Sequence, residues 1–357
     1  MRRAAETGDR SGRARLALAA LGLLLVAALL GALDAGPVPV GWRALGSAGW
    51  AWLTGNAPPG PPSMAAIVLI DIRLPRVLMG VAVGALLAIG GAVLQGLFRN
   101  PLADPGIIGV SSGAALGAVV AIILGDGVLA PVLGPLGAYG LPLFAFAGAL
   151  AATFLLYRFA TVGGRTSVAT MLLAGIALAA LAGAVTGFLI FGSNDRQLRD
   201  ITFWSLGSLG GATWPKVASV APFLAALLVA VPFMARGLNA IVLGEAEARH
   251  LGIRVQALKR AGILLVAAAT GAAVAVSGVI GFVGIVVPHL LRLAIGPDHR
   301  YLLAGAGFGG AILLLLADMA SRTLVAPAEL PIGIVTAALG GPFFLWILLR
   351  RRGMMDL

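Results

Sequence analysis

The sequence predicts an all-α membrane protein with about ten transmembrane helices, and three observations support this fold class. The 357-residue chain is 60% hydrophobic and only 11% charged, whereas a soluble domain has roughly 25% charged residues. Apolar runs recur along the whole length and are long enough to cross a bilayer as helices. The chain lacks the ~10-residue segments of alternating hydrophobicity that a transmembrane β-barrel shows.

We expect a polar cytoplasmic segment at residues 1–15, one transmembrane domain over 16–352 and a cytoplasmic tail at 353–357. The first apolar run follows a basic head, as in a signal peptide, but it is long enough to span and no clean cleavage site follows. We therefore expect it to be retained. The ten predicted spans are 16–33, 73–97, 105–124, 141–160, 168–191, 216–235, 261–278, 280–295, 301–320 and 330–349.

Three connecting segments stand out between these spans. Residues 34–70 form a mixed loop with a proline-rich stretch at 58–62. Residues 192–215 are polar and aromatic, which predicts a short helix at the membrane interface with Trp204 and Trp214 as anchors. The most polar interior segment, 236–260, contains a run typical of an amphipathic surface helix.

The distribution of basic residues orients the chain. With ten spans, most of the 25 lysines and arginines fall on the side of the N-terminus, and basic residues favour the cytoplasmic side. Both termini are therefore predicted to be cytoplasmic, and the net charge of +11 indicates orientation in lipid rather than binding to nucleic acid. The similar segments 84–91 and 271–278 would run in opposite directions, which is typical of inverted repeats in transporters.

The chain shows no energy source of its own. No glycine precedes either lysine, so a phosphate-binding G-x-x-x-x-G-K-[ST] loop is missing from the sequence. Asp318 is the one plausible buried carboxylate, and an ion pair with Arg322 four residues on explains it better than a proton relay. The chain has no cysteine, and its three histidines lack metal-ligand spacing. We expect no catalytic residue, cofactor or metal, and energy supplied by a partner subunit.

Six motifs resemble those of the FecCD family of ABC-transporter permeases, which import iron-siderophores, haem and cobalamin. They are RLPR at 73–76, the run ending in NPLADP at 84–105, LLAG at 172–175, GEAEARHLGI at 244–253, SG-x-IGF-x-G-x-x-x-PH-x-x-R at 277–292 and ELPIG-x-x-T at 329–336. The resemblance implies a homodimer in the bacterial inner membrane with its pathway at the dimer interface. It also implies two cytoplasmic subunits that bind ATP and Mg²⁺ and a periplasmic substrate-binding protein.

The resemblance assigns roles to two groups of residues. Arg73, Arg76 and Arg322 would pair with carboxylates of the binding protein, since arginine–carboxylate pairs suit a docking contact; the alternative is that they anchor or position spans. The segment 236–260 would hold the surface that couples to the ATPase. Its proposed contact residues are Gly244, Glu245, Ala246, Glu247, Arg249, His250, Leu251 and Gly252.

The resemblance also suggests a cytoplasmic gate. Asn100 and Leu102 lie in the polar break after the second predicted span, and Thr166 and Ser167 open the fifth. Helix capping is the alternative for these polar side chains.

The segment 196–209 resembles the haem-permease branch of the family. Arg196 and Arg199 would lie at the outer mouth of the pathway and guide the two propionates of haem. Ferric siderophores are also often anionic, and interfacial anchoring is an alternative role for both arginines. Two other classes of protein remain open, an ion-coupled secondary carrier and a membrane scaffold or channel.

Overall fold

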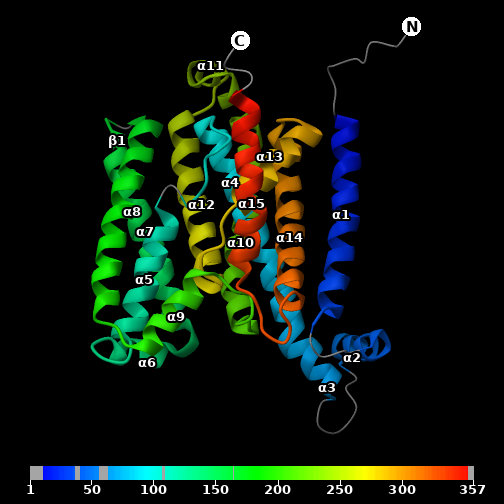
Figure 1. Ribbon diagram of the computed structural model, residues 1–357. Helices are drawn as coiled ribbons and strands as arrows, with labels where there is room; N and C mark the ends of the chain where they lie inside the picture. Colours follow the sequence, from blue (N-terminus) through cyan, green and yellow to red (C-terminus); the bar gives the residue numbers. More distant parts are fainter. Residues whose placement is uncertain (1–10, 37–40, 56–62, 107–108, 164, 353–357) are drawn as a thin grey trace.

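A computed structural model describes residues 11–36, 41–55, 63–106, 109–163 and 165–352 and shows a helical bundle (Figure 1). The predicted all-α class is confirmed. The strands within these residues are β1 (Thr161–Val162) and β2 (Arg165–Thr166), an antiparallel pair that joins two long helices. Residues 1–10 of the predicted N-terminal segment, the prolines at 58–62 and the tail at 353–357 lie outside the described residues.

Seven helical segments in the described part are long and apolar enough to cross a membrane. They are built from α1 (Ser11–Asp34), α3 with α4 (Met64–Ile67 and Leu74–Phe98), α6 with α7 (Ala130–Leu136 and Gly140–Ala160), α8 (Val168–Phe191), α10 (Trp214–Leu243), α12 (Val255–Ser277) and α14 (His299–Thr323). Three shorter apolar helices occupy the positions of the remaining predicted spans. They are α5 (Val110–Leu124), α13 (Val283–Ile295) and α15 (Ile332–Arg352).

The segment 34–70, predicted as a loop, is largely helical. It contains α2 (Trp42–Thr54), and a π-helical stretch at Val68–Arg73 joins α3 to α4, so this span begins before residue 73. Trp52 of α2 stacks on Trp214 with ring centroids 6.1 Å apart, and the Trp214 indole donates to the Ile70 carbonyl at 3.0 Å. These contacts over long sequence separations support helices in a stretch whose local composition indicates a loop.

Two further boundaries differ from the prediction. The polar segment 192–215 forms α9 (Asp195–Ser205), as expected, and a capping box between Asn194 and Gln197 fixes its start. α10 continues through Leu243, so residues 236–243 of the predicted loop are helical, because the buried side chains of Leu238 and Ile241 extend its packed face.

α4 is the central helix of the bundle, with 89% of its most apolar window buried. A Cβ atom at Gly84 would overlap the carbonyl oxygen of Gly310 in α14, and one at Gly91 would overlap that of Gly284 in α13. Close backbone approach through small residues is the main way in which helices associate in lipid. The glycines of α4 therefore fix it against two neighbours, and the site elements are positioned by this contact.

The two ends of the bundle differ. The start of α1 and the end of α15 lie at the end that also carries α11 (Glu245–His250), and α2, α6 and α9 lie at the opposite end (Figure 1). We call these the α11 end and the α9 end. The described ends of the chain thus share one side of the bundle, as we expect for the ten predicted spans.

Candidate functional site

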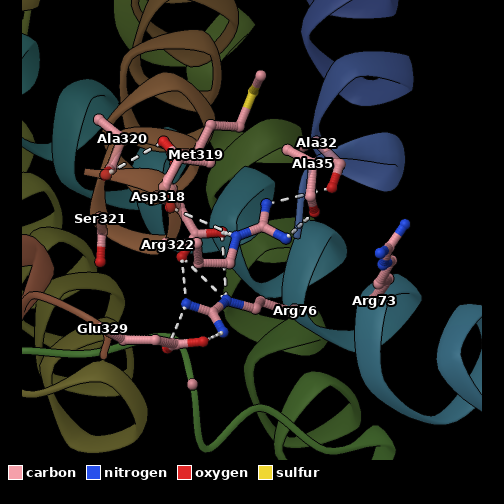
Figure 2. A network of polar contacts seen from close by, with 12 residues as sticks. Ala32, Ala35, Arg73, Arg76, Asp318, Met319, Ala320, Ser321, Arg322 and Glu329 are labelled. Carbon is pink, nitrogen blue, oxygen red and sulfur yellow. Dashed lines mark hydrogen bonds and ion pairs between the residues drawn. The ribbon is translucent and has the colours of Figure 1, made fainter. Parts of the chain in front are cut away.

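An ion network at the α9 end joins α4, α14 and the loop before α15 (Figure 2). The Nε atom of Arg76 donates to both carboxylate oxygens of Asp318 in α14, at 3.0 and 3.2 Å. The terminal nitrogens of Arg76 donate to the two oxygens of Glu329, at 2.9 Å each. This two-pronged, charge-assisted geometry is the strongest that arginine forms with a carboxylate. One guanidinium thus connects two helices and a loop.

Two neighbouring arginines bind carbonyl groups at the end of α1, and Figure 2 shows the contacts of Arg322. Arg322 donates to the carbonyl oxygens of Ala35 at 2.7 Å and Ala32 at 3.1 Å. Arg73 donates to those of the two intervening residues, at 2.6 and 2.9 Å. The final carbonyls of a helix have no partner within it and carry partial negative charge, so cations stabilise them. These contacts attach the end of α1 to α14 and to the head of α4.

The three arginines assigned to docking are buried inside the chain. Arg73, Arg76 and Arg322 are 3%, 7% and 4% exposed. Their contacts perform the alternative role that the sequence analysis kept open, which is positioning the spans. Docking stays a prediction.

The carboxylates of this network differ in exposure. Asp318 is 1% exposed and pairs with Arg322 at 3.1 Å, which confirms the predicted ion pair four residues apart. The side chain of Glu329 is 41% exposed. Hydrogen bonds from Arg76 hold the pKa of Glu329 below its ordinary value. No role for Glu329 was predicted from sequence, although this residue opens the 329–336 motif at the same end of the bundle as three buried arginines.

The predicted coupling segment forms the short helix α11 at the opposite end of the bundle (Figure 1). Ala248 is fully buried, and Glu245 pairs with the buried amine of Lys259 at 2.5 Å, which fixes the helix to α12. Of the other predicted contact residues, Gly244 is buried. The remaining six are exposed: Ala246, Glu247, Arg249, His250, Leu251 and Gly252. The face is therefore charged, accessible and held in place, as a contact surface for another subunit requires.

The residues assigned to the gate have structural contacts of their own. The Asn100 side chain accepts from the Leu102 backbone at 3.0 Å and stabilises the turn after α4. Ser167 accepts from the Thr170 backbone at 3.3 Å and caps α8, so the capping alternative is confirmed for Ser167. Thr166 lies buried in β2, and its backbone donates to Gln256 at 3.3 Å. Their role as a gate stays a prediction.

The two arginines assigned to the pathway lie on the surface helix α9. Both are exposed, and Arg196 lies 4.0 Å from Asp200 one turn on. Helix α9 is at the same end of the bundle as the loop that carries Glu329 (Figure 1). Accessible cations at this end suit either guidance of an anionic cargo or anchoring at the membrane interface.

A polar cluster at the α11 end was missed by the sequence analysis. The Asn239 side-chain oxygen of α10 accepts from the His299 backbone at 2.9 Å and lies 2.8 Å from the Nδ1 atom of that histidine. Arg292 of α13 donates to Gln95 of α4, whose amide donates to a carbonyl of α13 at 3.0 Å. Gln95 and Arg292 both occur in the family motifs, but no local pattern pairs residues so far apart in the chain.

Comparisons with known proteins identify the family of this chain. The model of the FecCD transport family matches residues 19–350. A hemin transport system permease protein of Yersinia pestis is 47% identical over 338 residues, which cover 95% of this chain and 96% of that protein. A cobalamin import system permease protein of Halobacterium salinarum is 41% identical over 371 residues, covering 95% and 97%.

A solved structure is similar over nearly the same length. It is described as an inward-facing conformation of a putative metal-chelate type ABC transporter. The TM-score is 0.78 at 32% sequence identity, and the match covers 93% of this chain and 98% of that chain. Because the family model matches residues 19–350, nearly the whole chain, the protein belongs to the FecCD transport family and is a membrane permease of an ABC importer.

Proposed function

We propose that this chain is the haem-conducting half of a homodimeric importer in the bacterial inner membrane, with both termini in the cytoplasm. The observation that carries the cargo assignment is the likeness to the hemin permease over 95% of the chain. The exposed pair Arg196 and Arg199 on α9 supports it, because two cations suit the two propionates of haem. Haem then passes from a periplasmic binding protein, through the dimer interface, to the cytoplasm.

The two ends of the bundle face different partners. The α11 end faces the cytoplasm. There, each of two ATPase subunits contacts the exposed side of α11 in one permease chain of the dimer. The basic residues of this end agree with that orientation, because positive charge favours the cytoplasmic side. The α9 end faces the periplasm and the binding protein. The permease hydrolyses no ATP itself.

The dimer interface is proposed at the exposed apolar face of α8. Helix α8 exposes Leu173, Ile176 and Phe188, which are 70%, 66% and 78% exposed. An apolar groove of about 530 Å³ runs between α5, α7 and α8. A second copy of the chain against this face would enclose an apolar path.

A second cargo class is favoured by the other similar proteins. The Halobacterium salinarum relative is described as a cobalamin import system permease protein, and the similar structure as a putative metal-chelate type ABC transporter. Cobalamin and ferric siderophores are therefore the competing cargoes. They differ from haem in bulk and in the position of negative charge, and a direct competition separates them.

The test is uptake by proteoliposomes that contain the permease, its ATPase and its binding protein. Haem, a ferric siderophore and cobalamin are offered singly and in competition, with ATP available to the ATPase. We expect labelled haem to be taken up. Unlabelled haem should suppress this uptake, and neither the ferric siderophore nor cobalamin should do so. Preferential uptake of cobalamin or of the siderophore would overturn the cargo assignment.

A pair of variants tests the proposed role of α9. Replacing Arg196 and Arg199 with Gln should lower haem uptake at limiting concentration, since two guiding charges are removed. Arg43→Gln, compared with Arg196→Gln and Arg199→Gln singly, is the matched control, because Arg43 is an exposed basic residue on α2 at the same end of the bundle. Equal uptake by these variants would assign the α9 arginines to interfacial anchoring.

A further inference from the structure

The two edges of the Arg76 guanidinium are held by carboxylates of very different accessibility. Asp318 binds the Nε edge, is 1% exposed and is also paired with Arg322. Glu329 binds the terminal nitrogens, is 41% exposed and comes from a loop. The inner partner is therefore fixed within helix α14, and the outer partner is one that a carboxylate from outside can replace.

We propose that Glu329 occupies the docking position of a partner carboxylate, and that the binding protein exchanges one of its own Asp or Glu side chains for Glu329 on Arg76. The inference rests on the proposed function, in which a binding protein docks at the α9 end. It adds that the docking surface is closed in the free permease. Docking therefore displaces an internal ligand and releases the loop that carries it.

Charge balance determines which partner chemistry fits. Within the ion-paired set, the charges of Arg76 and Arg322 are balanced by those of Asp318 and Glu329. The third buried arginine, Arg73, binds backbone carbonyls at the end of α1 instead. Departure of Glu329 without replacement leaves one positive charge of Arg76 uncompensated at the partly exposed edge of the network, which is unfavourable. Replacement by another carboxylate keeps the balance and the paired hydrogen bonds. An acidic side chain fits this position, and a basic or apolar one does not.

The loop that Glu329 holds connects the docking position to the proposed pathway. Three and four residues after Glu329, the backbone N–H groups of Ile332 and Gly333 donate to the carbonyls of Gly207 and Leu206, each at 3.0 Å. Those carbonyls follow directly after α9, which carries the proposed cargo arginines, and Ile332 begins α15. Release of Glu329 thus acts on the start of α15 and on the end of α9 together.

The test compares Glu329→Gln with Asp126→Asn. Both substitutions remove one negative charge at the α9 end, but Asp126 is an exposed residue between α5 and α6, away from the ion network. Affinity for the binding protein of the uptake assay is measured with the permease in nanodiscs. The Glu329→Gln permease lacks the internal competitor, so its affinity for the binding protein should be roughly fivefold higher than that of the wild type. This is the factor that corresponds to the free energy of a partly exposed ion pair. Asp126→Asn should match the wild type.

A second measurement follows the loop itself. Deuterium exchange over residues 324–331 should rise in the wild-type permease when the binding protein is added. In Glu329→Gln it should already be raised before addition and should not rise further. Exchange that is the same in free wild type and free Glu329→Gln would overturn the proposal.

The outcomes separate this inference from the proposed function. Unchanged or weaker docking by Glu329→Gln, together with ATP-driven haem uptake, would overturn the exchange at Arg76 and leave the function intact. If the Glu329→Gln permease binds the binding protein more tightly but the system imports another cargo, the carboxylate exchange at Arg76 is supported and the assignment of haem is overturned.

Discussion

Replacing Asp318 with Asn tests the ion network most sharply. Asp318 is 1% exposed and accepts from Arg76 at 3.0 and 3.2 Å, and its pair with Arg322 measures 3.1 Å. The substitution removes the negative charge between two buried cations, and breaking a buried ion pair from one side costs about 3–5 kcal/mol. Glu329 still neutralises Arg76, so we expect the lower part of this range, about 3 kcal/mol.

The assay is thermal unfolding of the purified permease in one detergent, followed by tryptophan fluorescence. A loss of this size should lower the unfolding midpoint on the order of 5 °C. Asp126→Asn is the control, because it removes an exposed carboxylate through the same chemical change and should leave the midpoint unchanged. If Asp318→Asn unfolds at the same temperature as Asp126→Asn, the network does not stabilise the bundle and our reading of it is wrong.

Three further predictions concern other parts of the bundle. Gly91→Ala forces a methyl group against a backbone carbonyl of α13 and should destabilise the permease by more than about 1 kcal/mol. Gly183→Ala is the control, because a Cβ atom there meets nothing within 4 Å and should cause no such loss. Equal unfolding midpoints for the two variants would contradict the close packing of α4 and α13. Because hydrogen bonds from Arg76 lower the pKa of Glu329 from 4.5, their pair stabilises fully above that pH and is lost as the pH falls through the lower folded-state pKa. Midpoints of wild type and Glu329→Gln should therefore converge on acidification, and a constant difference would exclude this contribution. Ser167→Ala removes the cap of α8 and should cost about 1 kcal/mol; loss of transport in a capped and stable Ser167→Asp variant would instead support the gate.

The positions of the spans follow from the sequence because hydropathy is a local property. The apolar runs of α8 and α10 are read directly from composition, and the structure places helices at the position of every predicted span. α2 was missed because its packing depends on Trp52 meeting Trp214, which lies far along the chain. Local composition cannot report such a contact.

The candidate sites also differ in whether local sequence or long-range contacts define them. The charged run at 244–253 is local, so the helix α11 was predictable from its amphipathic pattern. The burial of Arg76 was not, because its carboxylate partners Asp318 and Glu329 lie 242 and 253 residues further along. From sequence alone, an arginine at a predicted membrane face is expected to be exposed. Arg76 is instead buried because it pairs with carboxylates that lie far along the chain.

The central claim is that this permease conducts cargo while a partner subunit supplies the energy. The most direct test is haem accumulation by proteoliposomes that contain the permease and binding protein with an active ATPase, an inactivated ATPase or none. We predict accumulation with the active ATPase and none in the other two preparations, with or without an imposed ion gradient. Accumulation driven by an ion gradient in vesicles without the ATPase would contradict the account and identify a secondary carrier.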